Sequence, residues 1–277
     1  MSRSPLTPLL AEASAAGRAV GAFNVVQIEH AEAYAAAAER VGLPVVMQIS
    51  ENCVRYHGSL GPLAAATLAI ADACAQPVVV HLDHAEDVDL VEEAVRLGLT
   101  SVMFDGSMLP DDENRAATRR VVELCHSAGM SIEAELGEIG GKDGVHAPGA
   151  RTDPADAARF VADTGVDALA VAVGSSHAMA DRTAELDTDL IAALRDSVPV
   201  PLVLHGSSGV PDAGLVAAVR AGMTKVNIAT HLNRVFTRAM TDRLEQSPTV
   251  DTRVYLGAAR DAVTDEAARL LQLLALR

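Results

Sequence analysis

Short apolar runs alternate along this sequence with Ala-, Glu- and Arg-rich stretches that have helical periodicity. Such alternation is typical of a parallel sheet whose strands are joined by crossover helices. The apolar runs predict strands at Gly21–Val26, Pro44–Ser50, Val78–His84, Ser101–Gly106, Ser131–Gly137, Ala168–Val173, Pro201–Leu204 and Lys225–Thr230. Strand–helix repeats of this number predict an α/β fold, a (β/α)8 TIM barrel, with an extra C-terminal helix near Ala258–Leu274. An open doubly wound sheet is the alternative, but no GxGxxG motif follows the first strand.

The chain of 277 residues contains no linker, charge block or low-complexity segment that would divide it. Because barrels of this type use about 250 residues, we expect one domain, residues 1–277. The helix after the fifth strand is predicted to start at Thr152–Asp153–Pro154, where an N-cap candidate precedes a proline.

A net charge of −15 argues against nucleic acid or an anionic membrane as a partner. Backbone N–H groups, a metal or a few arginines can still bind a phosphorylated substrate locally. Cys53, Cys74 and Cys125 are odd in number and widely spaced, which indicates reduced thiols in a cytoplasmic protein. We expect no signal peptide at Met1–Pro5 and no membrane span in the interrupted Ala-rich runs.

Histidines follow three of the predicted strands, as His84, His177 and His205. Neutral imidazole is the commonest metal ligand, and three protein ligands with an open position are typical of catalytic zinc. The sequence therefore predicts a catalytic metal site, with Asp83 beside it as a proton-transfer carboxylate. Since side chains alternate along a strand, His84 would share this site with Asp83 only if the strand ends there.

Other polar residues lie at predicted strand ends, where a barrel places its active site. They are Asn24, Ser50, Asp105, Glu135, Asn227 and Thr230. Asp105 and Glu135 are interpreted as partners that orient the imidazoles, as ligands of a second or alternate metal position, or as ordinary caps of the next turn. The turns His205–Gly209 and Asn227–Thr230 close the seventh and eighth strands, where barrels often bind phosphate.

Lysine is rare in this chain, which contains only Lys142 and Lys225. A Schiff-base enzyme needs a lysine inside its site. Lys142 is predicted in a loop, and Lys225 is predicted at the start of the eighth strand, near the end of the barrel away from the site. We therefore expect a metal, rather than an imine, as the electrophile.

Several motifs in order resemble the class II, metal-dependent ketose-bisphosphate aldolases, with the tagatose-bisphosphate branch the nearest. They are Gly21–Asn24, His81–His84, Ser101–Ser107, Glu133–Gly137, His205–Gly206, Lys225–Thr230 and Tyr255–Gly257 through Arg260. The resemblance covers nearly the whole chain. It implies cleavage of a ketose bisphosphate to dihydroxyacetone phosphate and an aldehyde, in a cytoplasmic homodimer or homotetramer.

The resemblance also implies roles for individual residues. His84, His177 and His205 would hold Zn2+, with Asp105 and Glu135 at an alternate position or near a second cation, monovalent or divalent. Asp83 would protonate the aldehyde-derived oxygen. Dihydroxyacetone phosphate would be bound by the strand-end residues Asn24, Ser50, Gly206, Ser207, Ser208, Asn227, Ile228, Ala229 and Thr230, and Arg260 would reach the distal phosphate, across a subunit interface if necessary.

The sequence departs from the family pattern at three places. Ala178 replaces the glycine that usually follows the sixth-strand histidine, at a substrate-contacting position. Asp143 stands in a short Gly-rich loop where the family commonly has glutamate, and we expect it to move the proton on the enediolate carbon. His231 replaces an acidic residue. These departures bear on the substrate more than on the reaction.

Other functions remain open on the sequence alone. One is a zinc aldolase for another phosphorylated ketose or a deoxy sugar acid. A zinc hydrolase is a second, although it would not need two phosphate-binding turns. A non-catalytic barrel subunit is a third, although this chain has all three histidines together with Asp83.

Overall fold

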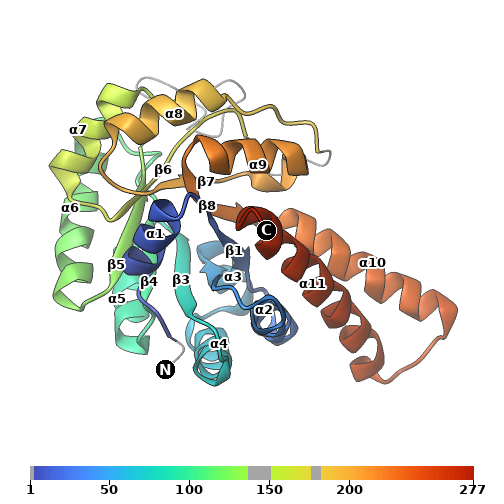
Figure 1. The fold of residues 1–277 in the computed structure, drawn as a ribbon. Helices are drawn as coiled ribbons and strands as arrows, with labels where there is room; N and C mark the ends of the chain where they lie inside the picture. The colour runs from blue at the N-terminus through green and yellow to red at the C-terminus, as the bar shows by residue number, and fades with distance from the viewer. Residues whose placement is uncertain (1–2, 137–150, 176–181) are drawn as a thin grey trace.

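The computed structural model describes residues 3–136, 151–175 and 182–277, in which eight parallel strands form a closed barrel. The strands are β1 (Val20–Asn24), β2 (Val45–Ser50), β3 (Val78–Ala85), β4 (Ser101–Phe104), β5 (Ser131–Glu135), β6 (Ala168–Ala170), β7 (Leu202–Leu204) and β8 (Met223–Ile228). Each strand pairs with the next in sequence, and β8 pairs with β1 (Figure 1). Closure confirms the predicted TIM barrel and excludes an open sheet.

Helices surround this barrel, with crossovers between the strands. In the described residues they are α1 (Leu6–Ala15), α2 (Ile28–Val41), α3 (Glu51–His57), α4 (Gly61–Ala73), α5 (Val88–Leu97), α6 (Asp111–Ser127), α7 (Pro154–Thr164), α8 (Thr188–Ser197), α9 (Asp212–Ala221), α10 (Thr230–Gln246) and α11 (Thr252–Leu274). The predicted start of α7 is confirmed, because the Asp153 side chain accepts a hydrogen bond from Asp156 N–H and Pro154 opens the helix. Across the described ranges, no helix has the length and apolar character needed to cross a membrane.

Three helices and two strands named here differ from the sequence-based expectation. Helices α1 and α3 were not predicted, and α11 begins at Thr252 rather than near residue 258. The strands near the sixth and eighth runs are also shifted, since β6 ends at Ala170 and β8 begins at Met223. The shift of β8 matters for the site, because Lys225 is then the third residue of the strand and lies within the barrel wall.

Apolar side chains form two separate clusters. The larger cluster fills the space between the strands and the surrounding helices. The smaller cluster joins residues of the barrel strands, such as Val46, Val79 and Val203, to Leu6 and Leu10 of α1. Helix α1 therefore closes one end of the barrel, and the N–H and hydroxyl groups of its Thr7 hydrogen-bond to Ser131 at the start of β5.

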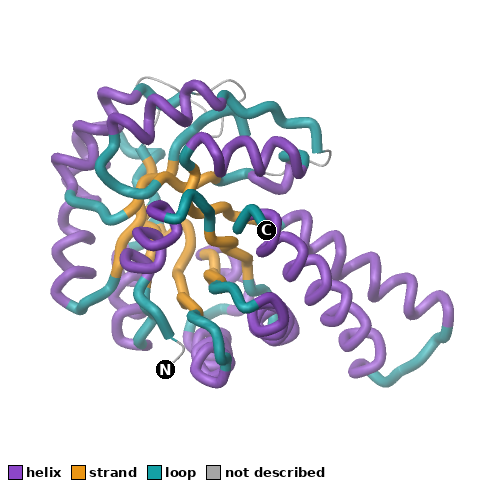
Figure 2. Tube along the Cα trace, in the orientation of Figure 1, coloured by secondary structure: helices purple, strands orange, loops and turns teal. Residues whose placement is uncertain are grey.

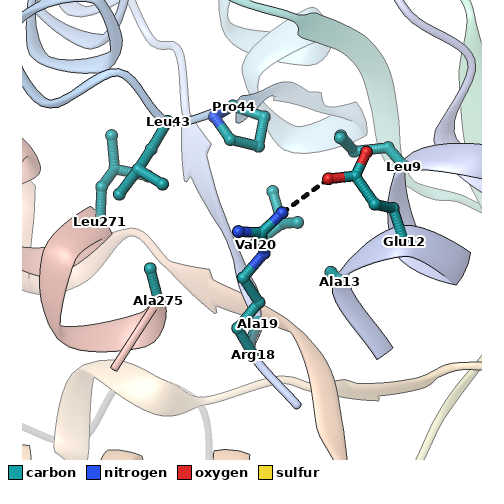
Figure 3. Close-up of a pocket in the computed structure, with 10 residues that line it drawn as sticks. All are labelled: Leu9, Glu12, Ala13, Arg18, Ala19, Val20, Leu43, Pro44, Leu271 and Ala275. Carbon is teal, nitrogen blue, oxygen red and sulfur yellow. Dashed lines mark hydrogen bonds and ion pairs between the residues drawn. The ribbon is translucent and has the colours of Figure 1, made fainter. Parts of the chain in front are cut away.

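At the end closed by α1, the cavity that the described residues line is too small for a substrate. A cavity of about 10 Å³ lies there among α1, β1 and α11, beside an ion pair of 2.7 Å between Arg18 and Glu12 (Figure 3). This volume holds at most about one water molecule. Chemistry must therefore take place at the opposite end, where the strands terminate.

Helices α10 and α11 form a hairpin beside the barrel, and Figure 2 shows it extending away from the strands. Helix α11 packs on α2 and on α10. The α2 face is rich in alanine, with Ala31, Ala35 and Ala38 buried, so the two helices approach closely. Glu266 of α11 accepts a 2.6 Å hydrogen bond from the His231 ring of α10, and Arg269 joins Glu266 to Asp212 of α9.

Candidate active site

The C-terminal ends of the strands bring ionisable side chains together, as the sequence predicted. His84 is the next-to-last residue of β3, Asp105 follows β4, Glu135 ends β5 and His205 follows β7. These strands run parallel around the barrel, so their ends meet on one face. Of the predicted site residues, Asp143, His177 and Ala178 lie outside the described residues, as does Lys142.

His84 reaches this face through an irregularity in β3. Its φ of 50° lies in the left-handed region, and the pairing of β3 with β4 shifts between Leu82 and Ala85. A β-bulge of this kind re-aims a side chain that strict alternation would place on the other face. The strand therefore continues to Ala85, and Asp83 and His84 still reach the same site.

The residue that supports this bulge is Glu51, the first residue of α3. Its carboxylate accepts hydrogen bonds from the N–H of Glu86, at 2.7 Å, and of Asp87, at 3.4 Å. Arg55 pairs with the other carboxylate oxygen of Glu51. Helix α3 thus fixes the backbone directly after His84, a role that the sequence alone did not indicate.

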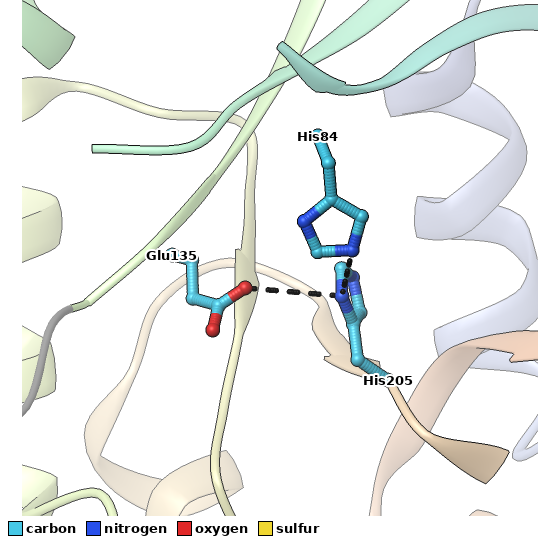
Figure 4. Close-up of side chains that lie close together, drawn as sticks. All are labelled: His84, Glu135 and His205. Atoms are coloured by element: carbon cyan, nitrogen blue, oxygen red, sulfur yellow. Dashed lines mark hydrogen bonds and ion pairs between the residues drawn. The ribbon is translucent and has the colours of Figure 1, made fainter. Parts of the chain in front are cut away.

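Two imidazoles and one carboxylate form the centre of the site (Figure 4). His84 Nε2 lies 3.1 Å from His205 Nδ1, and Glu135 Oε2 lies 3.8 Å from the same Nδ1. One ligand atom from each of the three residues lies within 4.8 Å of the others. This donor set suits a divalent transition metal such as zinc, which takes imidazole and carboxylate ligands.

Each imidazole is oriented through its other nitrogen. His84 Nδ1–H donates to Asp105 Oδ2 at 2.7 Å, and Asp105 is itself held by the N–H and hydroxyl of Ser107. His205 Nε2 lies 2.9 Å from Glu133 Oε1. Carboxylates placed in this way fix the tautomer and direction of metal-binding histidines, so the nitrogens that face each other point to a place where a metal could bind.

Negative charge dominates the site. Burial alone would lower the pKa of His84, but Asp83, the hydrogen-bonded Asp105 and Glu135 raise it to about 10. Burial, followed by the charge of Asp105, raises the pKa of Glu135 well above its ordinary value. Burial would also raise the pKa of Asp105, yet the hydrogen bond from His84 holds it well below that value. Buried carboxylates around two imidazoles are the arrangement that a bound cation stabilises.

Asp83 is held by two amides. Asn24 Nδ2 and Gln48 Nε2 donate to Asp83 Oδ2 at 3.1 and 3.2 Å, and Gln48 Nε2 also lies 2.8 Å from Asn24 Oδ1. Among the described residues, Asp83 Oδ1 is buried and accepts no hydrogen bond. One carboxylate oxygen is thus fixed, and the other is left for a reacting group. Gln48 was not predicted, although it stands two residues before Ser50 on the same face of β2.

The turns after β7 and β8 lie side by side. Gly206 has a φ of 67°, which leads into a short 3-10 helix at Ser207–Gly209, and this helix contacts β8 and the start of α10. The Ser208 hydroxyl accepts a 3.2 Å hydrogen bond from His231 N–H in the first turn of α10. Helix α10 has no side-chain N-cap at Ala229, so the other N–H groups of its first turn, apart from that of His231, are placed where an anion could accept from them.

Two predicted substrate residues have other contacts in this structure. The Ser50 hydroxyl caps α3 by accepting from Cys53 N–H at 3.2 Å. Arg260, on α11, donates to Glu32 of α2 at 3.0 Å. Both are contacts within the protein, and neither indicates where a substrate would bind.

The expected position of Lys225 is wrong. Its ammonium group lies 2.8 Å from Glu133 Oε2, both side chains are fully buried, and Glu133 in turn contacts His205. Lys225 therefore lies inside the barrel, close to the site, because β8 begins two residues earlier than expected. Glu133 is part of a motif identified in the sequence, but no role was predicted for it. The Glu–Ala–Glu spacing could have indicated one, because it places Glu133 and Glu135 on one face of β5.

A closed parallel barrel with a His/Glu group at its strand ends that could hold a metal is typical of the barrel enzymes. The family described as class II fructose-bisphosphate aldolase matches residues 4–276, and the chain belongs to this family. It is an aldolase, a carbon–carbon lyase.

Similar solved structures agree with this assignment. The YdjI aldolase from Escherichia coli K12 is 29% identical, with a TM-score of 0.85 and coverage of 98% of this chain and 97% of that chain. A putative fructose-1,6-biphosphate aldolase from Coccidioides immitis is 28% identical, with a TM-score of 0.86 and coverage of 97% and 95%. The fold is shared with fructose-bisphosphate aldolase from Campylobacter jejuni, at 22% identity, a TM-score of 0.85 and coverage of 99% and 95%.

Proposed function

We propose that this aldolase is zinc-dependent and cleaves a ketose bisphosphate, of the fructose 1,6- or tagatose 1,6-bisphosphate type. The products would be dihydroxyacetone phosphate and an aldehyde such as glyceraldehyde 3-phosphate. The observation that supports this most is the meeting of His84 Nε2 and His205 Nδ1 beside Glu135 and Asp83. His84 and His205 would hold the zinc, together with His177 or Glu135. Bound zinc would supply Lewis-acid polarisation of the substrate ketone.

The chain's own residues perform the proton transfers in this proposal. Asp83 takes the proton from the C4 hydroxyl during cleavage and returns it to the aldehyde oxygen during condensation, through Oδ1, which accepts no hydrogen bond from the residues that the structure describes. Asn24 and Gln48 hold the other oxygen, so the carboxylate does not rotate away. Asp143 is proposed, from sequence alone, to move the proton on the carbon of the dihydroxyacetone phosphate half.

The phosphate of that half is proposed to lie against Gly206–Ser208 and Asn227–Thr230. The adjacency of these turns and the uncapped start of α10 support the assignment, since such N–H groups bind phosphate. Ser50 and Arg260 are retained as proposed phosphate contacts. A second candidate substrate is a ketose 1-phosphate that lacks the distal phosphate, which is favoured by the pairing of Arg260 with Glu32.

We also propose that residues 1–277 act as one domain in a cytoplasmic homodimer or homotetramer. The three cysteines are free and buried, which fits a reducing compartment. A second cation, monovalent or divalent, is proposed near Asp105 and Glu135.

The test is an assay of dihydroxyacetone phosphate release from fructose 1,6-bisphosphate, tagatose 1,6-bisphosphate and fructose 1-phosphate. We expect a chelator to abolish release and added zinc to restore it, while borohydride with substrate leaves activity intact. Substrate-dependent inactivation by borohydride would mean that a lysine forms an imine, and the proposed mechanism would be rejected. A preference for fructose 1-phosphate would favour the second candidate substrate.

A further inference from the structure

A buried ion pair lies inside the barrel, next to the proposed metal site but outside the proposed chemistry. Lys225 Nζ of β8 lies 2.8 Å from Glu133 Oε2 of β5, and neither side chain is exposed to solvent. Lysine is almost never fully buried without a partner, and a buried ion pair is no general source of stability. The presence of this buried ion pair therefore needs an explanation other than protein stability.

Glu133 links this pair to His205. Its second oxygen lies 2.9 Å from His205 Nε2. A carboxylate only accepts hydrogen bonds, so the contact places the ring hydrogen of His205 on Nε2. The Nδ1 lone pair then faces His84 Nε2 at 3.1 Å, where a metal ligand is needed.

Among the described residues, Lys225 is the cation whose ammonium group contacts Glu133. The other ionisable groups nearby are the carboxylates of Glu135, Asp105 and Asp83 and the rings of His81 and His84. His84, with its raised pKa, lies beyond His205 and is paired with Asp105. Burial, followed by the charge of Lys225, lowers the pKa of His81, which shares a 2.9 Å hydrogen bond with Ser101. His81 is therefore neutral, and the charge that faces the Glu133 carboxylate directly is that of Lys225.

We propose that Lys225 is a positioning residue: through its ion pair with Glu133, it fixes the Nε2–H tautomer of His205 and so keeps the lone pair on Nδ1, the nitrogen that would bind the metal. The proposal rests on the proposed metal site. It assigns the buried lysine of this aldolase to the metal centre rather than to an imine or to general stability.

The experiment compares two double variants that both remove the buried charges. Lys225→Met/Glu133→Gln keeps a carbonyl oxygen that can accept from His205 Nε2–H, whereas Lys225→Met/Glu133→Leu has no acceptor. Ser101→Ala is the matched control, because it removes a hydrogen bond in the barrel interior without contacting His205. The readouts are zinc dissociation constants, thermal unfolding of the metal-free proteins, and the His205 tautomer from long-range ¹H–¹⁵N correlation spectra of the metal-free proteins.

We expect His205 in the metal-free wild-type protein to be the Nε2–H tautomer. The Leu variant should lose this preference and bind zinc about 10- to 100-fold more weakly, the range seen when partners of metal ligands are removed. The Gln variant should retain the tautomer and bind zinc more tightly than the Leu variant, and Ser101→Ala should match the wild type. Lys225→Met alone, which removes the ion pair and keeps Glu133, is measured beside the double variants and should change in the same direction as the Leu variant. It also replaces the Leu variant if that variant does not fold, and a wild-type tautomer and zinc affinity in Lys225→Met would overturn the proposal.

Two results with the double variants would likewise overturn the proposal. One is wild-type tautomer and zinc affinity in the Leu variant, and the other is equal loss in the Gln and Leu variants. Failure of the metal site itself would look different, since the wild-type protein would bind no zinc. In that case the His205 tautomer in metal-free Lys225→Met, compared with metal-free wild-type protein, would still test the role of Lys225.

Discussion

At the scale of single residues, each functional group of this site is held by a hydrogen-bond partner at the atom that points away from the centre of the site. His84 and His205 are both held by a carboxylate at the nitrogen turned away from the centre, and Asp83 is held by two amides. The sequence predicted the groups at the centre because they follow apolar strands. It did not predict Gln48, Glu133 or Lys225, because a polar residue inside a strand is ambiguous until the barrel interior is known.

The roles of ligand and proton donor are separable by mutation. We expect His205→Ala to lose bound zinc, since a ligand of the coordination sphere is missing. Asp83→Ala should retain zinc, but cleavage should fall on the order of 10²–10⁴-fold, the typical value of general acid–base catalysis. Metal analysis of the purified variants, together with cleavage rates, checks both. An empty site in Asp83→Ala would make Asp83 a ligand and refute this assignment.

At the scale of elements, the strands and crossover helices followed from sequence, whereas two helices did not. Helix α1 has leucines at helical spacing, but it covers the end of the barrel rather than the flank of a strand, so the strand–helix alternation gave no reason to expect it. Helix α3 is only seven residues long, which is too short for periodicity to be distinctive. The bulge at His84 could not be predicted from the sequence either, because it depends on tertiary contacts of the residues that follow His84.

Helix α3 is expected to support the metal site through Glu51. Glu51→Ala should leave the N–H of Glu86 without its protein acceptor and destabilise the protein by roughly 0.5–1.5 kcal/mol, the net contribution of a typical hydrogen bond. We also expect faster hydrogen exchange at Glu86 N–H and weaker zinc binding. Glu86→Ala is the control, because it removes an exposed carboxylate and keeps the same N–H bond. Equal zinc affinity in Glu51→Ala and the control would show that α3 does not support His84.

At the scale of the whole molecule, polar contacts hold the α10–α11 hairpin to the rest of the chain. Glu266 lies at their centre. Burial alone would raise its pKa, but hydrogen bonds from Arg269 and His231 lower it to about 2. A depressed folded pKa means that the contribution to stability is present above the unfolded value of 4.5 and is lost as the pH falls towards 2.

Glu266→Gln should therefore lower the free energy of unfolding at pH 7 by about 1–2 kcal/mol, after allowance for solvent screening at this partly exposed group. The difference from the wild-type protein should shrink between pH 4.5 and about 2. Urea unfolding across this pH range measures the difference in free energy of unfolding. Asp265→Asn, a substitution of an exposed carboxylate, is the control. A difference that stays constant with pH would show that the Glu266 charge is not responsible.

The closure of one barrel end by α1 has a consequence for how this protein can change. Apolar side chains fill the half of the barrel next to α1, and ionisable groups occupy the half at the strand ends. The residues that stabilise the fold and the residues proposed for the chemistry thus lie in different halves of the same barrel. Loops and polar residues at the C-terminal ends of the strands can therefore change during evolution and give a new sugar specificity. The apolar half next to α1 keeps the barrel stable meanwhile.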